Sequence, residues 1–282
     1  MKTLLFIGGT GFLGKSFFDY LQSSELLQKK LSKIIIISRQ RKKITSKVKI
    51  SFINKSIANL NSIPVTDYII YAANSKNNKE NKNGILNFKN LLNHKHKKTK
   101  ILFTSSGALY GKINKTRKIK ETDIVSIKKV QKFRGYKRNY AISKIEMEKE
   151  FILLSKKGFK VSIARLFTFI GKRILKNENF AITNLIHQAK NKNIKAIKLS
   201  DTRDVYRGYM DSKDLVRWLF KILINSKNKY NIYNVGSDEA VTIEKIAKLI
   251  GKNYNKPILQ SKTKAKNKID YYVPSILKAK KN

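Results

Sequence analysis

The chain has 282 residues, of which 41% are hydrophobic, and 62 lysines and arginines against 18 aspartates and glutamates give it a formal net charge of +44. It contains no cysteine, which excludes a disulfide framework, a thiol nucleophile and a cysteine-ligated metal, and three histidines argue against a histidine-rich metal site. The opening apolar run is too short for a signal peptide, and no later segment resembles a membrane span. We therefore expect a cytoplasmic protein without a metal.

The positive charge favours binding of nucleic acid or of an anionic membrane surface. The excess is mostly lysine, however, and it is spread over nearly every polar segment instead of forming one stripe. Asparagine and isoleucine are abundant as well, which is typical of a drift toward AT-rich codons. We interpret the charge mainly as drift that also attracts polyanionic small substrates, and nucleic acid is not the partner we expect.

The first fourteen residues contain a glycine-rich turn. An apolar run over residues 4–7 leads into three glycines at the spacing G-x-x-G-x-x-G, and apolar residues at helical intervals follow. This pattern predicts a buried strand, a tight turn and a helix N-terminus, whose free N–H groups can bind a phosphate. The alternative is a strand–helix turn that merely contains glycines. The residues predicted to contact a dinucleotide here are Gly8, Thr10, Gly11, Phe12, Leu13 and Gly14.

Strand patterns and helix patterns then alternate along the chain. Apolar strands are predicted at 33–37, 48–53, 67–72, 100–104 and 160–165, and helices at 83–93 and 140–156. This alternation predicts a parallel sheet with helices on both faces, and in such sheets ligands bind beyond the carboxyl ends of the strands.

The pattern becomes irregular after residue 165. It predicts a strand at 194–199, a helix with an apolar stripe at 211–224, a strand at 230–235, and a helix at 242–250 that ends at Gly251. We divide the chain into a dinucleotide-binding domain over 1–165 and a smaller substrate-binding lobe over 166–282. The strand at 230–235 is a candidate for the sheet of the first domain.

The end of the second predicted strand bears on the choice of cofactor. An NAD-specific site usually has a carboxylate there for the ribose hydroxyls, whereas arginine accepts the 2′-phosphate of NADP. This strand ends in Ser38 and Arg39, with no aspartate or glutamate near. We therefore predict NADP, and NAD is the alternative, because Arg39 and Arg41 could equally be two more solvated cations.

Candidate catalytic residues follow the fifth strand. Ser106 stands at its carboxyl end, and Tyr140 and Lys144 lie one turn apart on one face of a predicted helix. An ammonium favours the ionised form of a nearby phenol, so Tyr140 could exchange a proton with a substrate hydroxyl that Ser106 also binds. Tyr209 and Lys213 repeat the spacing, but only Tyr140 follows a glycine-rich loop and opens a long helix.

Three motifs occur in this order: Gly8-x-x-Gly11-x-x-Gly14, Ser106-x-x-x-Tyr110-Gly111 and Tyr140-x-x-x-Lys144. With them the chain resembles the extended short-chain dehydrogenase/reductase family, in its NAD-dependent epimerase/dehydratase branch. The likeness covers almost the whole chain and continues in Asn81-x-x-Gly84, Arg165-x-Phe167 and Tyr233-Asn234-Val235-Gly236-Ser237. It implies an α/β Rossmann-type, doubly wound parallel sheet with a smaller C-terminal substrate domain, and commonly a homodimer.

Within this family, the runs at 179–184 and 207–210 resemble nucleotide-sugar 4-reductases such as CDP-abequose synthase. That likeness implies that Asn184 and Arg207 hold the pyrophosphate of a nucleotide-diphosphate sugar, with Asn81 and Ser106 also at the substrate. It further implies that Ala72 and Ala73 line the dinucleotide, and that Lys144 tunes Tyr140 and holds the nicotinamide ribose.

The chain also departs from the family. Sugar-nucleotide 4,6-dehydratases have an Asp-Glu pair after the catalytic hydroxyl residue, where this chain has Gly107 and Ala108, so dehydration lacks its acid and base. The aspartate that often follows the third strand is missing from 52–56, and Thr168 replaces a frequent asparagine. The chain stops about where relatives continue into a last helix, so we expect a short C-terminal lobe.

These observations predict an NAD(P)-dependent oxidoreductase of polysaccharide biosynthesis that reduces the 4-keto group of a nucleotide sugar. One alternative is a nucleotide-sugar 4-epimerase that retains NAD. Another, from a different class, is a catalytically idle Rossmann protein that binds RNA through its charge. The intact set of Ser106, Tyr140 and Lys144 argues against the last alternative.

Overall fold

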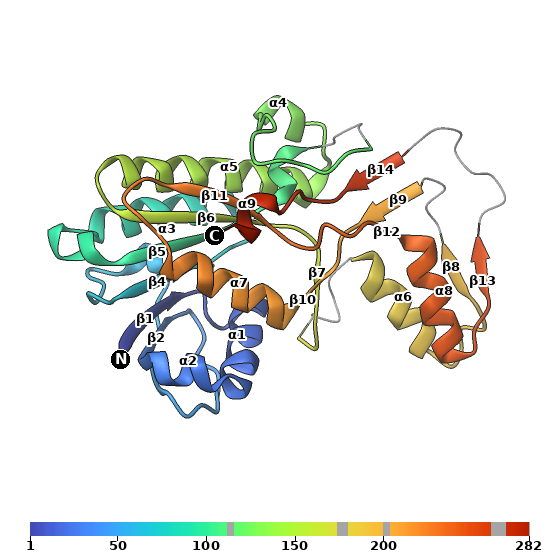
Figure 1. The fold of residues 1–282 in the computed structure, drawn as a ribbon, viewed down its shortest axis with the longest axis horizontal. Helices are drawn as coiled ribbons and strands as arrows, with labels where there is room; N and C mark the ends of the chain where they lie inside the picture. The colour runs from blue at the N-terminus through green and yellow to red at the C-terminus, as the bar shows by residue number, and fades with distance from the viewer. Residues whose placement is uncertain (112–115, 174–179, 200–203, 261–268, 282) are drawn as a thin grey trace.

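A computed structural model describes residues 1–111, 116–173, 180–199, 204–260 and 269–281 (Figure 1). Within these residues, the centre of the molecule is a seven-stranded parallel sheet of order β11-β6-β5-β4-β1-β2-β3. Its strands are β1 (Lys2–Ile7), β2 (Leu31–Ile37), β3 (Lys49–Ile53), β4 (Tyr68–Tyr71), β5 (Lys100–Ser106), β6 (Lys160–Leu166) and β11 (Asn231–Val235). The strand order reverses between β1 and β4, which confirms the predicted doubly wound sheet of Rossmann type.

The strands of this sheet are apolar because helices cover both of its faces. The last four residues of β1 are fully buried. In the register, Ile7 pairs with Ile37 of β2 and with Tyr71 of β4, so these three strands end at the same level. The ligand-binding edge that the sequence predicts is therefore formed by the loops that follow these strands.

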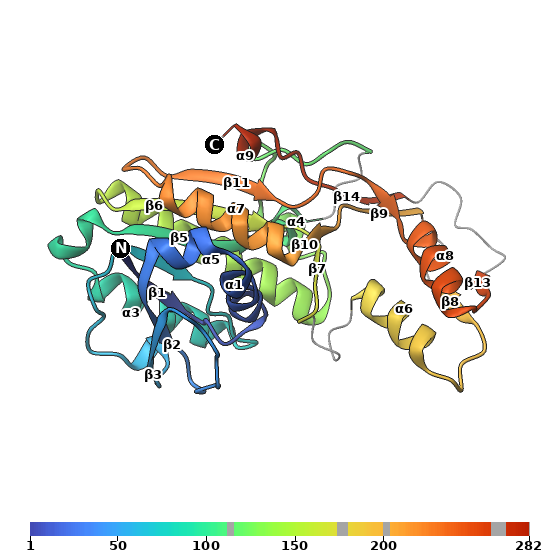
Figure 2. The same cartoon turned by 60° about the horizontal axis from the view of Figure 1, so that its bottom comes forward.

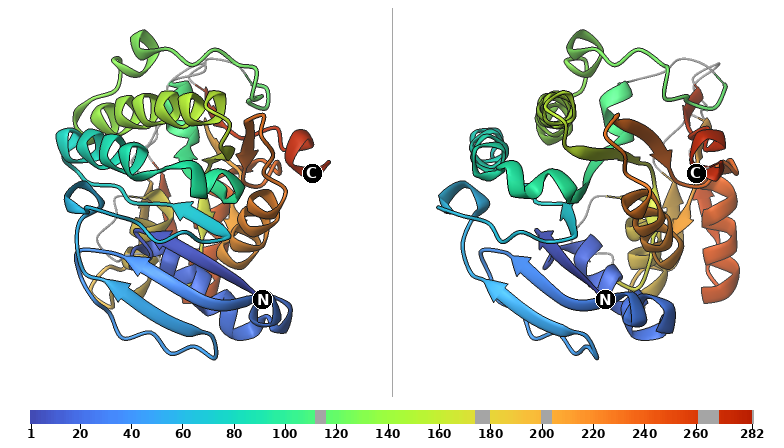
Figure 3. Two further views of the ribbon diagram at one scale, coloured as in Figure 1. Left: turned by 90° about the vertical axis from the view of Figure 1, so that its left-hand side faces the viewer. Right: turned by 60° about the vertical axis from the view of Figure 1, so that its left-hand side comes forward.

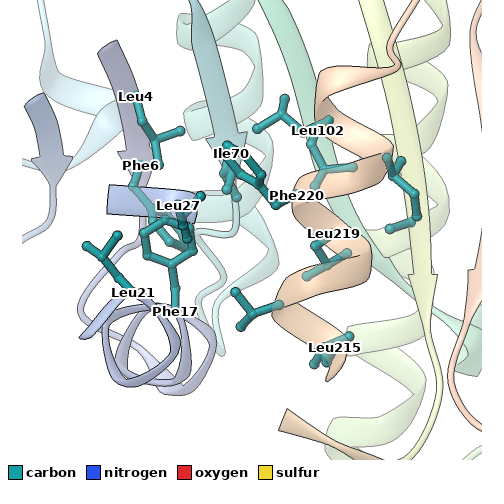
Figure 4. Packing of buried hydrophobic residues seen from close by; sticks show 14 of the residues in the cluster. Leu4, Phe6, Phe17, Leu21, Leu27, Ile70, Leu102, Leu215, Leu219 and Phe220 are labelled. Atoms are coloured by element: carbon teal, nitrogen blue, oxygen red, sulfur yellow. The ribbon is translucent and has the colours of Figure 1, made fainter. Parts of the chain in front are cut away.

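On one face, α1 (Phe12–Ser23) and α7 (Ser212–Ile224) pack side by side on the sheet. Figure 4 shows Phe17 and Leu21 of α1, and Leu215 and Leu219 of α7, directed into the core between these helices and the strands. On the other face lie α3 (Asn78–Leu91) and α5 (Gly135–Lys156), and Figure 3 shows the sheet between these layers. The shorter α2 (Glu25–Lys30) leads into β2.

A smaller lobe extends from one end of the sheet (Figures 1 and 2). In it α6 (Ala181–Lys190) packs against α8 (Ile243–Tyr254), and β8 (Ile197–Leu199) pairs in parallel with β13 (Ile258–Gln260). A three-stranded sheet of order β12-β9-β14 connects this lobe to the large sheet. The remaining strands and α-helices are β7 (Phe169–Ile170), β9 (Asp204–Arg207), β10 (Met210–Asp211), β12 (Val241–Thr242), β14 (Ile269–Tyr272), α4 (Ile127–Val130) and α9 (Leu277–Lys280).

Three predicted helices have wrong boundaries. The helix predicted at 83–93 is α3, which begins at Asn78, after the N-cap Asn77, and ends at Leu91. Helix α5 begins at Gly135, so Tyr140 lies in its second turn and does not open it. Helix α8 continues past Gly251 to Tyr254 and ends where Asn255 takes the left-handed conformation, with φ of 51°. The glycine has a packing role instead, because a Cβ at this position would lie 2.6 Å from the carbonyl oxygen of Lys256.

The strand predicted at 230–235 is β11, which pairs in parallel with β6 at the edge of the large sheet. Helix α7 also packs on this sheet. Thus α7 covers one face of the large sheet, and β11 extends the sheet at its edge. The segments before α7 and after β11 form the smaller lobe. The domain boundary at residue 165 stays a prediction.

Candidate active site

The predicted catalytic serine lies at the edge where the parallel strands end. Ser106 is the last residue of β5 and is 8% exposed. Its hydroxyl oxygen accepts a hydrogen bond of 3.2 Å from the backbone N–H of Ala108. The side chain is therefore anchored at the start of the following 3₁₀ turn, Gly107–Tyr110.

Tyr140 and Lys144 lie on one face of α5, as predicted. The Lys144 Nζ is 5.7 Å from the centroid of the Tyr140 ring, and it donates a 3.0 Å hydrogen bond to the carbonyl oxygen of Thr104, two residues before Ser106. The side chain of Lys144 is 3% exposed, and this burial lowers its pKa to about 8, against the opposing effect of Glu148. The structure thus brings the Tyr140–Lys144 pair to the end of β5.

The second tyrosine–lysine pair has a different structure. Tyr209 lies between β9 and β10, outside any helix, and Lys213 is in the first turn of α7. The two side chains therefore share no helix face, and burial raises the pKa of the Tyr209 phenol. An ammonium–phenol pair of the kind formed by Tyr140 and Lys144 is not repeated at this position.

A buried network of polar side chains holds α5 against the sheet. The Arg165 guanidinium donates two hydrogen bonds to Glu148 of α5, of 3.0 and 2.8 Å, and one of 2.8 Å to the hydroxyl of Tyr110. That hydroxyl in turn donates to Asn234 of β11 over 2.8 Å. Burial raises the pKa of Tyr110 to about 12, so it keeps its proton. The network therefore positions the helix that carries Tyr140 and Lys144. The sequence showed Tyr110, Arg165 and Asn234 only as motif positions and did not single out Glu148.

The glycine-rich turn follows β1 and meets the end of β4. Gly8 has φ of +82°, and a Cβ there would lie 2.6 Å from the backbone nitrogen of Ala73, so only glycine fits. A Cβ on Gly14 would collide with the carbonyl of Gly9. At Gly11 the nearest atom to a Cβ would be 3.5 Å away. Gly8 and Gly14 are thus required by packing, whereas the backbone at Gly11 remains open to a ligand.

The predicted cofactor residues come together around this turn. Gly11 precedes α1 as its N-cap and offers no side chain to the first N–H groups of the helix. The hydroxyls of Thr10 and Ser38 are 2.6 Å apart, which ties the turn to the end of β2, and Ala72 donates its N–H to the carbonyl of Ile7 over 2.9 Å. An open backbone at a helix N-terminus fits the pyrophosphate of a dinucleotide.

A carboxylate that local sequence did not reveal lies beside Arg39. The Arg39 guanidinium donates to Glu80 of α3 over 2.8 Å, and the second oxygen of Glu80 accepts a 2.6 Å hydrogen bond from Ser75. Glu80 is far from the second strand in sequence, so only the fold, which brings the first turn of α3 to the residue that follows Ser38, could show the pair. Arg39 is thus ion-paired with Glu80 and is not only a solvated cation.

Besides Ser106, three residues are assigned to the substrate by resemblance, and their surroundings differ. Asn81 is buried, and its amide binds the N–H and the carbonyl of Ser75 over 2.7 and 2.8 Å. Asn184 is exposed on α6 and accepts a hydrogen bond from Gln188. The Arg207 guanidinium donates to both carboxylate oxygens of Asp270, over 3.2 and 3.0 Å. Arg207 lies near the predicted catalytic Ser106, because its guanidinium is beside Tyr272, whose hydroxyl is next to Gly107.

Tyr272 is a site residue that the sequence analysis missed. Its ring lies beside Phe167, with centroids 4.7 Å apart, and 5.6 Å from the Arg207 guanidinium. A Cβ on Gly107 would collide with its hydroxyl, so this hydroxyl stands directly beside the residue that follows Ser106. Burial raises the pKa of Tyr272, and the nearby Tyr140 phenol adds to this effect.

Neither a metal cluster nor a membrane-spanning helix occurs in the described part of the chain. Its residues form no group of three or more histidine, cysteine, aspartate or glutamate side chains able to hold a metal ion. None of its helices combines the length and the apolarity needed to cross a bilayer.

Comparisons with known proteins agree with the Rossmann-type fold. The sequence model of the NAD dependent epimerase/dehydratase family matches residues 4–236. The structure resembles dTDP-glucose 4,6-dehydratase from Bacillus anthracis in complex with NAD, with a TM-score of 0.77, 17% identity, and coverage of 100% of this chain and 90% of that one.

The structure also resembles UDP-glucose 4-epimerase with UDP-glucose from Thermotoga maritima. The TM-score is 0.75 at 19% identity, with coverage of 99% of this chain and 91% of that one. For UDP-N-acetylglucosamine 4-epimerase from Methanobrevibacter ruminantium, the TM-score is 0.74 at 16% identity, with coverage of 99% and 91%. These likenesses show a shared fold. No curated protein sequence matches the chain significantly.

Proposed function

This chain belongs to the NAD dependent epimerase/dehydratase family, and on that premise we propose that it reduces the C4 ketone of a nucleotide-linked sugar with NADPH. The observation that carries the proposal is the composition of the site at the end of β5. Ser106, Tyr140 and Lys144 lie there together, whereas Gly107 and Ala108 bring no carboxylate. The fold shared with an epimerase solved with UDP-glucose supports a nucleotide sugar as substrate.

In this mechanism, Tyr140 gives its proton to the C4 oxygen as the ketone becomes an alcohol, and Ser106 donates a hydrogen bond to the same oxygen. The Lys144 amine, whose pKa is about 8, is mostly an ammonium at neutral pH and favours the phenolate that Tyr140 then becomes. When bound, the nicotinamide supplies the hydride. Arg207, oriented by Asp270, holds the pyrophosphate of the substrate.

The residues around the glycine-rich turn fit the cofactor. The open backbone at Gly11 and the N-terminus of α1 would hold its pyrophosphate, and the joined Thr10 and Ser38 hydroxyls would flank it. Arg39 would pair with the 2′-phosphate of NADP. Glu80, which already binds Arg39, has the charge that repels a 2′-phosphate, and this single observation favours the second candidate, a 4-epimerase that retains NAD.

Dehydration is the reaction that the site supports least. Elimination of water across C5 and C6 needs an acid for the leaving hydroxyl and a base for the C5 proton, and neither Gly107 nor Ala108 can act as one. Tyr272 also occupies the space that a side chain at residue 107 would need. Hydride transfer needs only Ser106, Tyr140 and the cofactor, together with the lysine that tunes the tyrosine.

Mass spectrometry tests the proposal directly. With NADPH and a nucleotide-linked 4-keto-6-deoxy sugar, the product should gain two hydrogens, and cofactor oxidation should match loss of the ketone one for one. Tyr140→Phe should lower single-turnover hydride transfer by about 100-fold or more while NADPH still binds, whereas Tyr209→Phe should leave it unchanged. Loss of water from a nucleotide-linked 6-hydroxy sugar would overturn the assignment, and conversion at C4 without net cofactor oxidation would favour the epimerase.

A further inference from the structure

Three neighbouring strands of the large sheet begin at the same edge. Lys100, the first residue of β5, pairs with Lys160, the first residue of β6, and β11 pairs with β6 from two residues further on. The segments that lead into these strands therefore meet at this edge, at the left of Figure 1, and we call them together the lysine face: residues 93–100, 153–160 and 224–230. Ser106 stands at the other end of β5, about 20 Å away, so the face is opposite the candidate active site.

Hydrogen bonds join the three segments of the lysine face. The Nζ of Lys97 donates to the carbonyl of Lys157 at the end of α5, and the Nζ of Lys100 donates to the carbonyl of Ile224, the last residue of α7. The Ser155 hydroxyl donates a 3.0 Å hydrogen bond to a carbonyl of the segment after α7. Because the C-terminal end of a helix attracts cations, Lys97 and Lys100 have a structural role here.

The face carries positive charge without a matching negative charge. Its three segments contain nine lysines and no aspartate or glutamate, and the carboxylate next to them, Asp67, already binds Lys2 over 2.8 Å. Besides Lys97, six of the lysines are exposed: Lys95, Lys98, Lys156, Lys157, Lys227 and Lys229. Because like charges at one edge repel one another, an anionic partner from outside the protein would stabilise this arrangement.

The residue types of the face distinguish between anionic partners. Nucleic acid is recognised by arginine forks and by aromatic rings on which bases stack. The face has no arginine, and its Phe159 and Tyr230 rings are buried and half-buried. Two exposed aliphatic side chains lie on or beside it instead: Leu153, 43% exposed, and Val65, 52% exposed, in the loop that accepts a hydrogen bond from Thr99. Lysines together with exposed aliphatic residues are typical of a surface that lies on a bilayer.

We propose that the lysine face docks this protein on the surface of an anionic phospholipid bilayer. The exposed ammonium groups bind the lipid phosphates, and Leu153 and Val65 enter the headgroup region. The opposite edge of the sheet, with Ser106 and the glycine-rich turn, then faces away from the bilayer and stays open to water-soluble ligands. Docking of this kind needs neither cofactor nor substrate, so it does not depend on the proposed function.

Cosedimentation of the full chain with mixed phosphatidylcholine–phosphatidylglycerol vesicles tests the proposal. Each lysine near an anionic surface strengthens binding about fivefold, so a face variant with four lysines replaced should bind about 100-fold more weakly or worse. Its substitutions are Lys156→Gln, Lys157→Gln, Lys227→Gln and Lys229→Gln. A lobe variant with the same net charge is the matched control and should change by less than about threefold. It replaces four exposed lysines of the smaller lobe: Lys190→Gln, Lys192→Gln, Lys195→Gln and Lys198→Gln. Equal losses in the two variants, or equal binding of the parent to pure phosphatidylcholine vesicles, would overturn the proposal.

A fluorescent label measures the orientation without removing any lysine. The chain has no cysteine, so one introduced cysteine can carry an environment-sensitive fluorophore at a chosen place. On addition of the mixed vesicles, a label at Asn228→Cys in the face should shift its emission to shorter wavelength, whereas one at Asn193→Cys in the smaller lobe should not. A shift at both positions or at neither would contradict the docking. Loss of binding to a short single-stranded RNA in the face variant, with vesicle binding unchanged, would assign the face to nucleic acid instead.

Discussion

The buried ammonium group of Lys144 should lower the stability of the protein at neutral pH. Burial lowers the pKa of Lys144 from 10.5 to about 8 in the folded protein. The unfolded chain therefore binds the proton more tightly, and at pH 7 this difference destabilises the folded state by about 3 kcal/mol. Between pH 8 and 10.5 the unfolded chain binds more protons than the folded one, so this contribution makes stability rise with pH.

Substitution of Lys144 by methionine keeps most of the aliphatic volume and removes the charge. The variant also loses the hydrogen bond from Nζ to Thr104, which stabilises by about 1 kcal/mol. We expect Lys144→Met to be more stable than the parent by about 2 kcal/mol at pH 7, although inactive. The gain should disappear as the pH approaches 10.5, where the amine is increasingly neutral in both states.

Urea denaturation of parent and variant at several pH values between 7 and 10 measures this difference. The exposed Lys149 of the same helix provides the control, because Lys149→Met should show no comparable dependence on pH. A Lys144→Met protein that is less stable than the parent at pH 7 would refute the reasoning. A difference in unfolding free energy that stays constant from pH 7 to 10 would refute it equally.

Two further substitutions test the network and the cofactor site. Glu148→Gln should destabilise the protein by about 3–5 kcal/mol in urea denaturation, because it leaves the buried Arg165 charge uncompensated; a loss below 1 kcal/mol would contradict this. If Arg39 binds the 2′-phosphate, calorimetry should show NADPH bound more tightly than NADH by about 1–3 kcal/mol, and Arg39→Ala should remove most of that gap. Glu80→Gln should widen it, and a preference of the parent for NADH would favour the epimerase.

The architecture could be predicted from sequence because parallel strands that are buried on both faces form continuous apolar runs. The runs around Leu4, Ile35 and Leu102 are all fully or almost fully buried, and each becomes a strand of the sheet. The Tyr140–Lys144 pair could be predicted equally well, because helical spacing alone brings the two side chains to one face. Both predictions depend on local periodicity.

The parts of the site that sequence did not reveal depend on contacts between distant segments. Glu80 reaches Arg39 from another βα unit, and Tyr272 reaches Gly107, the residue after Ser106, through the pairing of β14 with β9. No local spacing encodes either contact. At Gly251 the local sequence pattern is misleading, because a glycine after a helical run predicts the end of the helix. In the structure this glycine is needed where the backbone of Lys256 approaches the helix closely.

The place of β11 at the edge of the large sheet has a consequence for synthesis on the ribosome. Its partner β6 is complete at Leu166, but β11 begins only at Asn231. At about 5–20 residues per second, the nascent chain then waits about 3–13 s with one edge of β6 unpaired. An unpaired strand edge is a template for association with other chains, so newly made molecules pass through an interval in which chaperone binding competes with aggregation.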